Sequence, residues 1–441
     1  MKKLIFCVLS VLLFGPVLRA ESAGEILTFP ANASKGFHWG YALYLPTTMD
    51  TSKKLPILLT MNNEDVENSV EELEKQVRQD LRRNYSQYGI ADGVGVPMLV
   101  PLLLQDKEPF HTRQLNRAVF KLQEGPFAHL DKQVLAMLND AREQLKARGI
   151  RTQKKFLVAG FSTPGVFGWH FTMLQPEHVL AAVVGGHHNP MLPLAYYNSR
   201  SLIYPVGVQD MKQYAGRAFN KRAWLKVPIL AIIGGDDYND PLPYNHVYSD
   251  EERDVFYQLY GKGTMQDMWR QTRDILSVYA PNVQTHTYPN LGHEAVWQDE
   301  IEFLKKHING GPLQPITPTD TSDRPSKLPA HVTALYWGKE APIVADREYL
   351  SDTTFTLKVD EKFVYWMMYK SVCEIDILHQ GRAVLENIPC RGGWPEEAFI
   401  EIPLPPDDVR QLRSYKDRTF SVRSHHPEIL DIPENLTFTV R

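Results

Sequence analysis

The sequence predicts an α/β fold followed by a small β-rich domain, and two observations carry this prediction. Between about Gly24 and Asn309, strand-like apolar runs alternate with long helical patterns, which is typical of a mostly parallel sheet with helices on both faces. Between Val332 and Arg441, short β-like runs are separated by polar or proline-rich turns, which indicates a small all-β sandwich. The length of 441 residues agrees with two or three domains.

The expected strands of the first part are near-continuous runs of Val, Ile and Leu. Such runs are typical of strands that are buried on both faces of a parallel sheet. The expected strands are Tyr41–Leu45, Leu55–Thr60, Pro97–Leu104, Phe156–Ala159, Leu180–Val184, Pro228–Ile233 and Val283–Tyr288.

Three long segments repeat apolar residues at three- and four-residue steps, which predicts amphipathic helices. Ser69 and Glu72 fit a capping box at the start of the first, or lie inside a helix that begins slightly earlier, and Gly149 is a natural end for the second. Their Met and aromatic residues are interpreted as core rather than as cofactor contacts. The three segments are Val66–Leu81, Leu130–Leu145 and Met265–Tyr279.

The first 20 residues have the layout of a secretory signal peptide. Lys2 and Lys3 precede an apolar stretch, Leu4–Leu13, and Ala20 is a small residue at the expected cleavage site. The alternative is an uncleaved membrane anchor, but the run is short and Arg19 closes it. The prediction is an exported protein, either secreted or periplasmic.

Composition excludes some classes of partner. The formal net charge is −4, with 48 Lys and Arg against 52 Asp and Glu, so no basic footprint for nucleic acid is present. No apolar run after the first 20 residues reaches the length of a membrane-spanning helix. We therefore expect neither a nucleic-acid partner nor an integral membrane span.

The amino-acid composition of the sequence changes near Gly310. Glycine and proline are interleaved with Thr, Asp and Ser, which predicts a linker at residues 310–330, between a domain at 21–309 and a β-rich domain at 331–441. Cys373 and Cys390 are the two cysteines left after the signal peptide. They could form a disulfide in an exported protein, and the alternative is two buried free thiols.

A first candidate for chemistry is the turn Gly160–Gly165. It follows the apolar strand Phe156–Ala159 and precedes a helical pattern, a context that makes a nucleophile elbow at Ser162 credible. The strained turn projects the hydroxyl, and the N-terminus of the next helix faces the developing oxyanion. The alternative is an ordinary Gly-Ser loop.

Two further polar sites follow strands of the same sheet. The run Pro228–Ile233 leads through two glycines into Asp236 and Asp237, and the last strand leads through Leu291-Gly292 into His293. Each could be a solvated turn by itself. The order Ser, Asp, His along the chain is that of α/β-hydrolase triads, and the carboxyl ends of parallel strands meet at one edge of a sheet.

With these motifs, the region from about Gly24 to Asn309 resembles the α/β-hydrolase superfamily. It is most similar to its secreted esterases, including polyhydroxyalkanoate depolymerases and feruloyl or acetylxylan esterases. The resemblance rests on Gly160–Gly165, Gly234–Pro241 and Leu291-Gly292-His293.

The resemblance implies a role for each of these residues. Ser162 would be the nucleophile and His293 the general base. The acid of the family pattern falls on Asp237, with Asp236 as the next choice and Asp240 as a poor third.

The resemblance also implies an oxyanion hole. It would use the amide of Thr163 and one from the loop after Leu55–Thr60, where Asn62 and Asn63 are the best candidates. That loop departs from the His-Gly element of the family, and Pro164 stands where the family usually has Gly, so its bulk could alter the crossing of strand and helix there.

Other histidines and the central insertion receive weaker interpretations. His187 and His188 follow a strand and could line a pocket, but no carboxylate or Cys cluster completes a metal site, so no metal or other cofactor is expected. The irregular segment Ala195–Trp224 lies where this fold commonly carries a cap, and the alternative is a surface excursion.

The sequence-based conclusion is a secreted serine carboxylic-ester hydrolase that acts through a Ser-His-Asp triad and an acyl-enzyme. Its substrate would be a small-molecule or polymer ester, and contact with carbohydrate is one role open to the C-terminal domain. Two alternatives remain: a serine peptidase of the prolyl-oligopeptidase kind, although no propeller-like repeat is evident, and a non-catalytic binding protein on a hydrolase fold.

Overall fold

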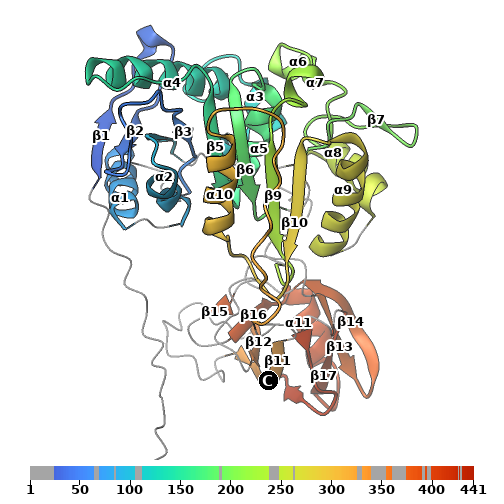
Figure 1. Ribbon diagram of the computed structural model, residues 1–441. Helices are drawn as coiled ribbons and strands as arrows, with labels where there is room; N and C mark the ends of the chain where they lie inside the picture. The colour runs from blue at the N-terminus through green and yellow to red at the C-terminus, as the bar shows by residue number, and fades with distance from the viewer. Residues whose placement is uncertain are drawn as a thin grey trace, which may run out of the picture.

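The computed structural model describes most of the chain (Figure 1). The described residues are 24–63, 69–83, 86–104, 112–187, 191–237, 248–261, 264–324, 330–338, 354–359, 374–389, 393–394, 399–425, 427 and 430–441. The predicted signal peptide, His188, Asp240, Cys373 and Cys390 lie outside them, so the disulfide and the export signal stay predictions.

An eight-stranded sheet forms the centre of the first part, in the order β1-β2-β4-β3-β5-β6-β9-β10 (Figure 1). Strand β2 pairs antiparallel with both β1 and β4, and every other neighbouring pair is parallel. The strands are β1 Glu25–Phe29, β2 Tyr41–Leu45, β3 Leu58–Leu59, β4 Met98–Pro101, β5 Phe156–Phe161, β6 Val179–Gly185, β9 Ile229–Gly234 and β10 Val283–Tyr288.

All seven strands expected in this part of the sequence are present, two of them shortened by proline. Only Leu58 and Leu59 of the run Leu55–Thr60 form β3, because Pro56 has no N–H to give to the sheet. Strand β4 likewise ends at Pro101 instead of Leu104. Strand β1 was not predicted, because this half-buried edge strand lacks the long apolar run of its neighbours.

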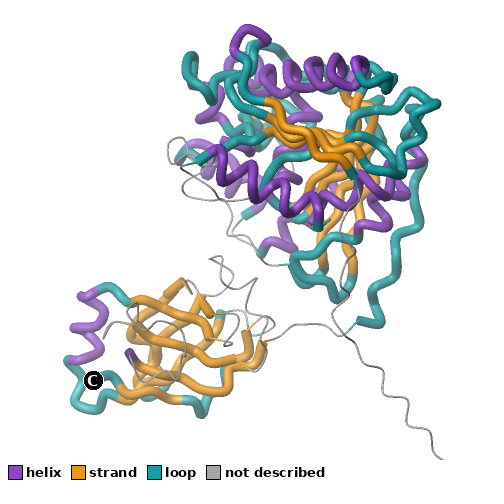
Figure 2. The backbone as a smooth tube through the Cα atoms, turned by 90° about the vertical axis from the view of Figure 1, so that its left-hand side faces the viewer, coloured by secondary structure: helices purple, strands orange, loops and turns teal. Residues whose placement is uncertain are grey.

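Helices pack on both faces of the sheet (Figure 2). The buried side chains of the strands alternate between two apolar cores, one on each face. One core contains residues of α4, α5, α8 and α9, and the other contains residues of α1, α2 and α10. The bounds are α1 Val70–Arg82, α2 Ile90–Val94, α3 Arg117–Lys121, α4 Leu130–Ala147, α5 Thr163–Leu174, α8 Asp250–Tyr260, α9 Met265–Tyr279 and α10 Trp297–His307.

The three predicted helices are α1, α4 and α9. The Ser69 side chain caps α1 by accepting a hydrogen bond from the Glu72 amide at 3.1 Å, and Gly149 ends the turn after α4 at φ 79°. Short elements connect the rest: the 3₁₀ helices η1 Ala33–Lys35, η2 Ser86–Gly89 and η3 Thr112–Gln114, and in the central insertion β7 Tyr196–Tyr197, β8 Arg200–Ser201, α6 Met211–Ala215 and α7 Lys221–Trp224.

The C-terminal part contains two further sheets around a separate apolar core. Their orders are β15-β16-β12-β11-β18 and β14-β13-β17-β19, and one short helix, α11, spans Pro406–Arg413. The strands are β11 Ala330–Trp337, β12 Thr354–Val359, β13 Glu374–His379, β14 Arg382–Pro389, β15 Gly393–Trp394, β16 Phe399–Pro403, β17 Thr419–Ser424, β18 Leu430–Asp431 and β19 Thr437–Thr439.

The described part of the predicted linker is bound to the first part by hydrogen bonds. The Ile316 backbone bonds the Gln284 side chain in both directions, and the Thr319 amide donates to Asp299 at 2.7 Å. The Asn290 side chain donates to the carbonyls of Ser322 and Arg324 at 3.0 and 2.8 Å. Residues 310–324 therefore lie along the α/β part, and we call this segment the strap.

Candidate active site

Ser162 occupies a strained turn between β5 and α5. Its φ of 64° and ψ of −131° fall in a region that residues other than glycine rarely adopt. The turn is held at both sides, because the Ser162 amide donates to Gly185 at 2.9 Å and its carbonyl accepts from Val166 at 3.0 Å. This is the local geometry of a nucleophile elbow.

Two glycines allow the strand and the helix to cross at this turn. A Cβ added to Gly160 would lie 2.2 Å from the carbonyl oxygen of Pro164, and one added to Gly165 would lie 2.3 Å from that of Gly185. Gly165 therefore makes the close approach, and Pro164 is accommodated in the first turn of α5, where the missing N–H costs nothing. The unusual position of the proline leaves the crossing intact.

We expect Gly165→Ala to destabilise the protein by about 2–3 kcal/mol, because the added methyl group must displace backbone rather than a flexible side chain. Urea unfolding of the purified protein measures this free energy. Gly292→Ala is the matched control, because a Cβ there meets nothing within 4 Å. Equal stabilities of the two variants would contradict the close crossing.

Asp237 and His293 form a hydrogen-bonded pair at the ends of β9 and β10. The Nδ1 atom of His293 lies 2.9 Å from Oδ2 of Asp237. The Asp237 side chain is fully buried, whereas the His293 side chain retains 18% exposure. Asp236 contacts the histidine loop differently, through its amide, which donates to the carbonyl of Leu291 at 2.9 Å.

The two loops that carry this pair are packed directly on each other. A Cβ on Gly234 would lie 2.1 Å from the carbonyl oxygens of both Leu291 and Gly292, so only glycine fits there. The side-chain amide of Gln266, from α9, donates to the carbonyls of Gly234 and Asp237 at 2.9 and 2.8 Å. Gln266 was not predicted, because its helix carries no motif.

The imidazole of His293 lies beside the elbow. Its ring centroid is 4.9 Å from that of Phe161, the residue directly before Ser162. Within the described ranges, the structure shows no hydrogen bond of the Ser162 hydroxyl, which is partly exposed. Such bonds in unliganded enzymes often tighten only when substrate is bound.

The predicted oxyanion donors are Thr163, which directly follows Ser162, and the loop after β3, the strand that neighbours β5. Thr163 opens α5, and the first amides of a helix have no acceptor within the helix. The Asn62 side chain is buried and exchanges hydrogen bonds with the Leu103 backbone, at 3.1 Å to its carbonyl and 3.3 Å from its amide. The Asn62 side chain is therefore engaged with Leu103, so its backbone amide is the group that Asn62 has left to offer an oxyanion.

His187, two residues after the end of β6, is buried next to Trp169 of α5, whose ring centroid is 6.2 Å away. Burial lowers its pKa to about 3, and burial lowers that of His170, on α5, to about 4. Nδ1 of His170 donates to the Gln114 carbonyl at 2.7 Å. Both rings are therefore neutral near pH 7. His187 is a buried packing residue and does not act as an acid or base at this pH.

These two histidines should make stability depend on pH. The pKa of His170 falls from about 6.5 in the unfolded chain to about 4 in the folded one, so the unfolded chain binds more protons in between. Stability should therefore decrease as the pH falls from 6.5 to 4, by up to roughly 3 kcal/mol for this group. Urea unfolding across this range measures the slope.

The matched variants are His170→Asn, which keeps a donor and removes the titrating ring, and His331→Asn at an exposed position. The first should reduce the slope and leave the part due to His187, and the second should leave the slope unchanged. An unchanged slope in His170→Asn would contradict the assignment.

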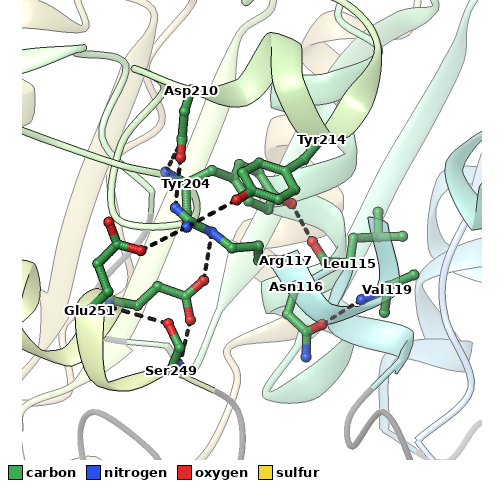
Figure 3. A network of polar contacts seen from close by, with 10 residues as sticks. Leu115, Asn116, Arg117, Val119, Tyr204, Asp210, Tyr214, Ser249 and Glu251 are labelled. Atoms are coloured by element: carbon green, nitrogen blue, oxygen red, sulfur yellow. Dashed lines mark hydrogen bonds and ion pairs between the residues drawn. The ribbon is translucent and has the colours of Figure 1, made fainter. Parts of the chain in front are cut away.

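The insertion Ala195–Trp224 is anchored by a buried arginine on α3 (Figure 3). Arg117 donates to Asp210 at 2.8 Å and to the Tyr204 carbonyl at 3.0 Å, and its guanidinium lies 4.6 Å from the ring centroid of Tyr214. It also pairs with Glu252 of α8 at 2.9 Å. The network fixes the insertion to the α/β part, and Arg117 was not predicted from sequence.

Within the described ranges, no group of three or more His, Cys, Asp or Glu side chains is placed to hold a metal ion. Nor does any helix there have the length and apolar character to cross a membrane.

No protein-family model matches the chain, and no curated protein matches it. Among solved structures, poly(aspartic acid) hydrolase-1 from Sphingomonas sp. KT-1 is similar at 13% identity and TM-score 0.43, over 65% of this chain and 99% of the other. A poly(3-hydroxybutyrate) depolymerase from Bordetella parapertussis shares 15% identity at TM-score 0.43, over 65% and 89% of the two chains. A ferulic acid esterase shares 14% identity at TM-score 0.37, over 65% and 97%.

The strand order, the single reversed strand β2 and the elbow after β5 define the first part as an α/β-hydrolase-like fold, followed by a smaller β-rich part. This agrees with the resemblance of residues 24–309 to that superfamily.

Proposed function

We propose that the protein is a serine hydrolase that cleaves carboxylic esters through Ser162, His293 and Asp237. The observation that carries the proposal is the hydrogen bond between His293 Nδ1 and the buried Asp237, beside a serine in a strained elbow. On the basis of the sequence, the proposal also includes export of the protein and a small-molecule or polymer ester as its substrate.

The proposed reaction uses each group of the site in turn. Ser162 Oγ attacks the ester carbonyl while Nε2 of His293 takes its proton, and Asp237 holds the tautomer that leaves Nε2 free to do so. The amide of Thr163 and one from the loop after β3 would stabilise the oxyanion. The C–O bond then breaks, His293 gives its proton to the alcohol, and water activated by His293 releases the acid.

Covalent labelling tests this function. The purified protein is treated with diisopropyl fluorophosphate, and intact-mass spectrometry should show one phosphoryl adduct that Ser162→Ala abolishes. The wild-type protein should hydrolyse p-nitrophenyl butyrate, and Ser162→Ala should not. No labelling of the wild type would support the non-catalytic alternative, and labelling that persists in Ser162→Ala would overturn the nucleophile.

A second substrate separates esterase from peptidase. If the proposal is correct, p-nitrophenyl butyrate is turned over much faster than butyryl p-nitroanilide, which has the same acyl group on an amide. Preferential turnover of the anilide would favour the peptidase alternative instead.

A further inference from the structure

We infer that Gln87 and Arg113 are positioning residues that fix the oxyanion-binding backbone after β3. The inference rests on the proposed function, because it concerns the same site. Neither residue belongs to the motifs of the elbow, the acid or the histidine. Gln87 lies in η2 and Arg113 lies in η3.

The sheet register brings the β3 loop level with the nucleophile. Leu58 pairs with Leu157 and Leu59 pairs with Val158 in parallel strands. Continued at the same step, this register puts Asn62 beside Phe161 and Asn63 beside Ser162, and neighbouring strands lie roughly 4.8 Å apart. The backbone of this loop is therefore next to the elbow.

Two buried donors hold successive carbonyl groups of that loop. The side-chain amide of Gln87 donates to the carbonyl of Met61 at 3.1 Å, and Nη1 of Arg113 donates to the carbonyl of Asn62, also at 3.1 Å. The exposed fractions of Gln87 and Arg113 are 0% and 2%. Both donors are therefore enclosed by protein and are not free to rotate away.

These two contacts fix the direction of the next two amides. A peptide group is planar and trans, so each N–H points opposite to the carbonyl of the preceding residue. Holding the carbonyl of Met61 thus fixes the direction of the Asn62 N–H, and holding the carbonyl of Asn62 fixes that of the Asn63 N–H. The Asn62 side chain, bonded to Leu103, fixes the loop from a third direction.

The helices that carry these two donors, which we call the brace residues Gln87 and Arg113, also contact the two elements on either side of Ser162. Helix η2 contacts β5, and η3 contacts α5. The contact of η3 is reinforced by His170 of α5, whose Nδ1 donates to the carbonyl of Gln114, the residue after Arg113. Oxyanion donors and nucleophile are therefore held by one connected set of buried polar contacts.

Catalytic donors act by being aimed in advance at the charge of the tetrahedral intermediate. A misplacement of about 1 Å can cost on the order of 100-fold in rate. The positive charge of Arg113, one hydrogen bond from the loop, also favours an oxyanion there. Loss of either contact should reduce the stabilisation of the transition state more than it reduces the binding of the substrate.

The experiment measures steady-state hydrolysis of p-nitrophenyl butyrate and inhibition by phenylboronic acid, which forms a tetrahedral adduct on a serine. Gln87→Leu and Arg113→Met should each lower kcat by about 10- to 100-fold. KM should change by less than about threefold, and the inhibition constant should rise by a factor comparable to the loss of kcat. Arg113→Lys, which keeps a donor and the charge, should recover part of the rate.

Gln133→Leu is the matched control for loss of a buried side-chain amide. Gln133, which lies on α4, donates from its side-chain amide to the carbonyls of Pro126 and Ala128, both at 2.8 Å. It should lose stability in a thermal melt but keep its kcat and its inhibition by phenylboronic acid.

Three outcomes would overturn the inference. An unchanged kcat in both folded brace variants would do so, and so would equal loss of kcat in Gln133→Leu, since the effect would then be general destabilisation. A wild-type enzyme that shows neither hydrolysis nor Ser162-dependent labelling would overturn the proposed function and this inference with it. Activity and labelling in the wild type, with brace variants like it, would overturn the inference alone.

Discussion

Asp237→Asn should lower kcat for p-nitrophenyl butyrate by about 10,000-fold. The Asp237 carboxylate only accepts hydrogen bonds, so it requires the proton of His293 to be on Nδ1 and leaves Nε2 free for the serine. An amide can donate to Nδ1 instead, which places the proton on Nε2 and removes the base. Asn is close to Asp in size, so the buried site should keep its shape.

Asp236→Asn is the matched control, because the two acids are adjacent and the hydrogen bond to the imidazole shown by the structure is that of Asp237. Asp236→Asn should lower kcat by roughly tenfold or less. The measurement is kcat from full saturation curves, with circular dichroism to verify folding. A reversed order, with Asp236→Asn the crippled variant, would move the acid to Asp236, the second choice from the sequence.

Arg117→Leu should destabilise the folded protein by about 3–5 kcal/mol. The side chains of Arg117 and Glu252 are only 6% and 2% exposed, so removing the cation leaves a carboxylate buried without its partner. Burial raises the pKa of Glu252, so the charged carboxylate depends on its cationic partner in this site. The free energy of unfolding in urea measures the loss.

Two variants make this test specific. Arg148→Leu removes an exposed pair with Glu25, whose side chains are 42% and 54% exposed, and should cost less than about 1 kcal/mol. Adding Glu252→Gln to Arg117→Leu should restore part of the stability, because the second change removes the stranded charge. If the double variant were less stable than Arg117→Leu alone, packing rather than charge would be responsible.

The sequence could predict the elements that depend on local pattern. Long apolar strands, helices with capping residues and the turn around Ser162 follow from spacing alone, and the structure contains all of these. The pairing of His293 with Asp237 rather than Asp236 could only be ranked, because adjacent carboxylates differ in direction and not in type.

Other features required the three-dimensional structure. Gln266, Gln87 and Arg113 act through backbone carbonyl groups, and a carbonyl has no signature in the sequence. The partners of Arg117 are 87 to 135 residues away along the chain, further than any periodicity reaches. The strap could not be predicted either, because proline-rich composition indicates an extended chain but not what it lies on.

The strap also limits the reach of the C-terminal part. Asn290, three residues before His293, grips the chain at Ser322 and Arg324, and β11 begins at Ala330. Six peptide steps span at most roughly 20 Å. The first strand of the β-rich part therefore begins within roughly 20 Å of the point where Asn290 holds Arg324, close along the chain to the histidine loop.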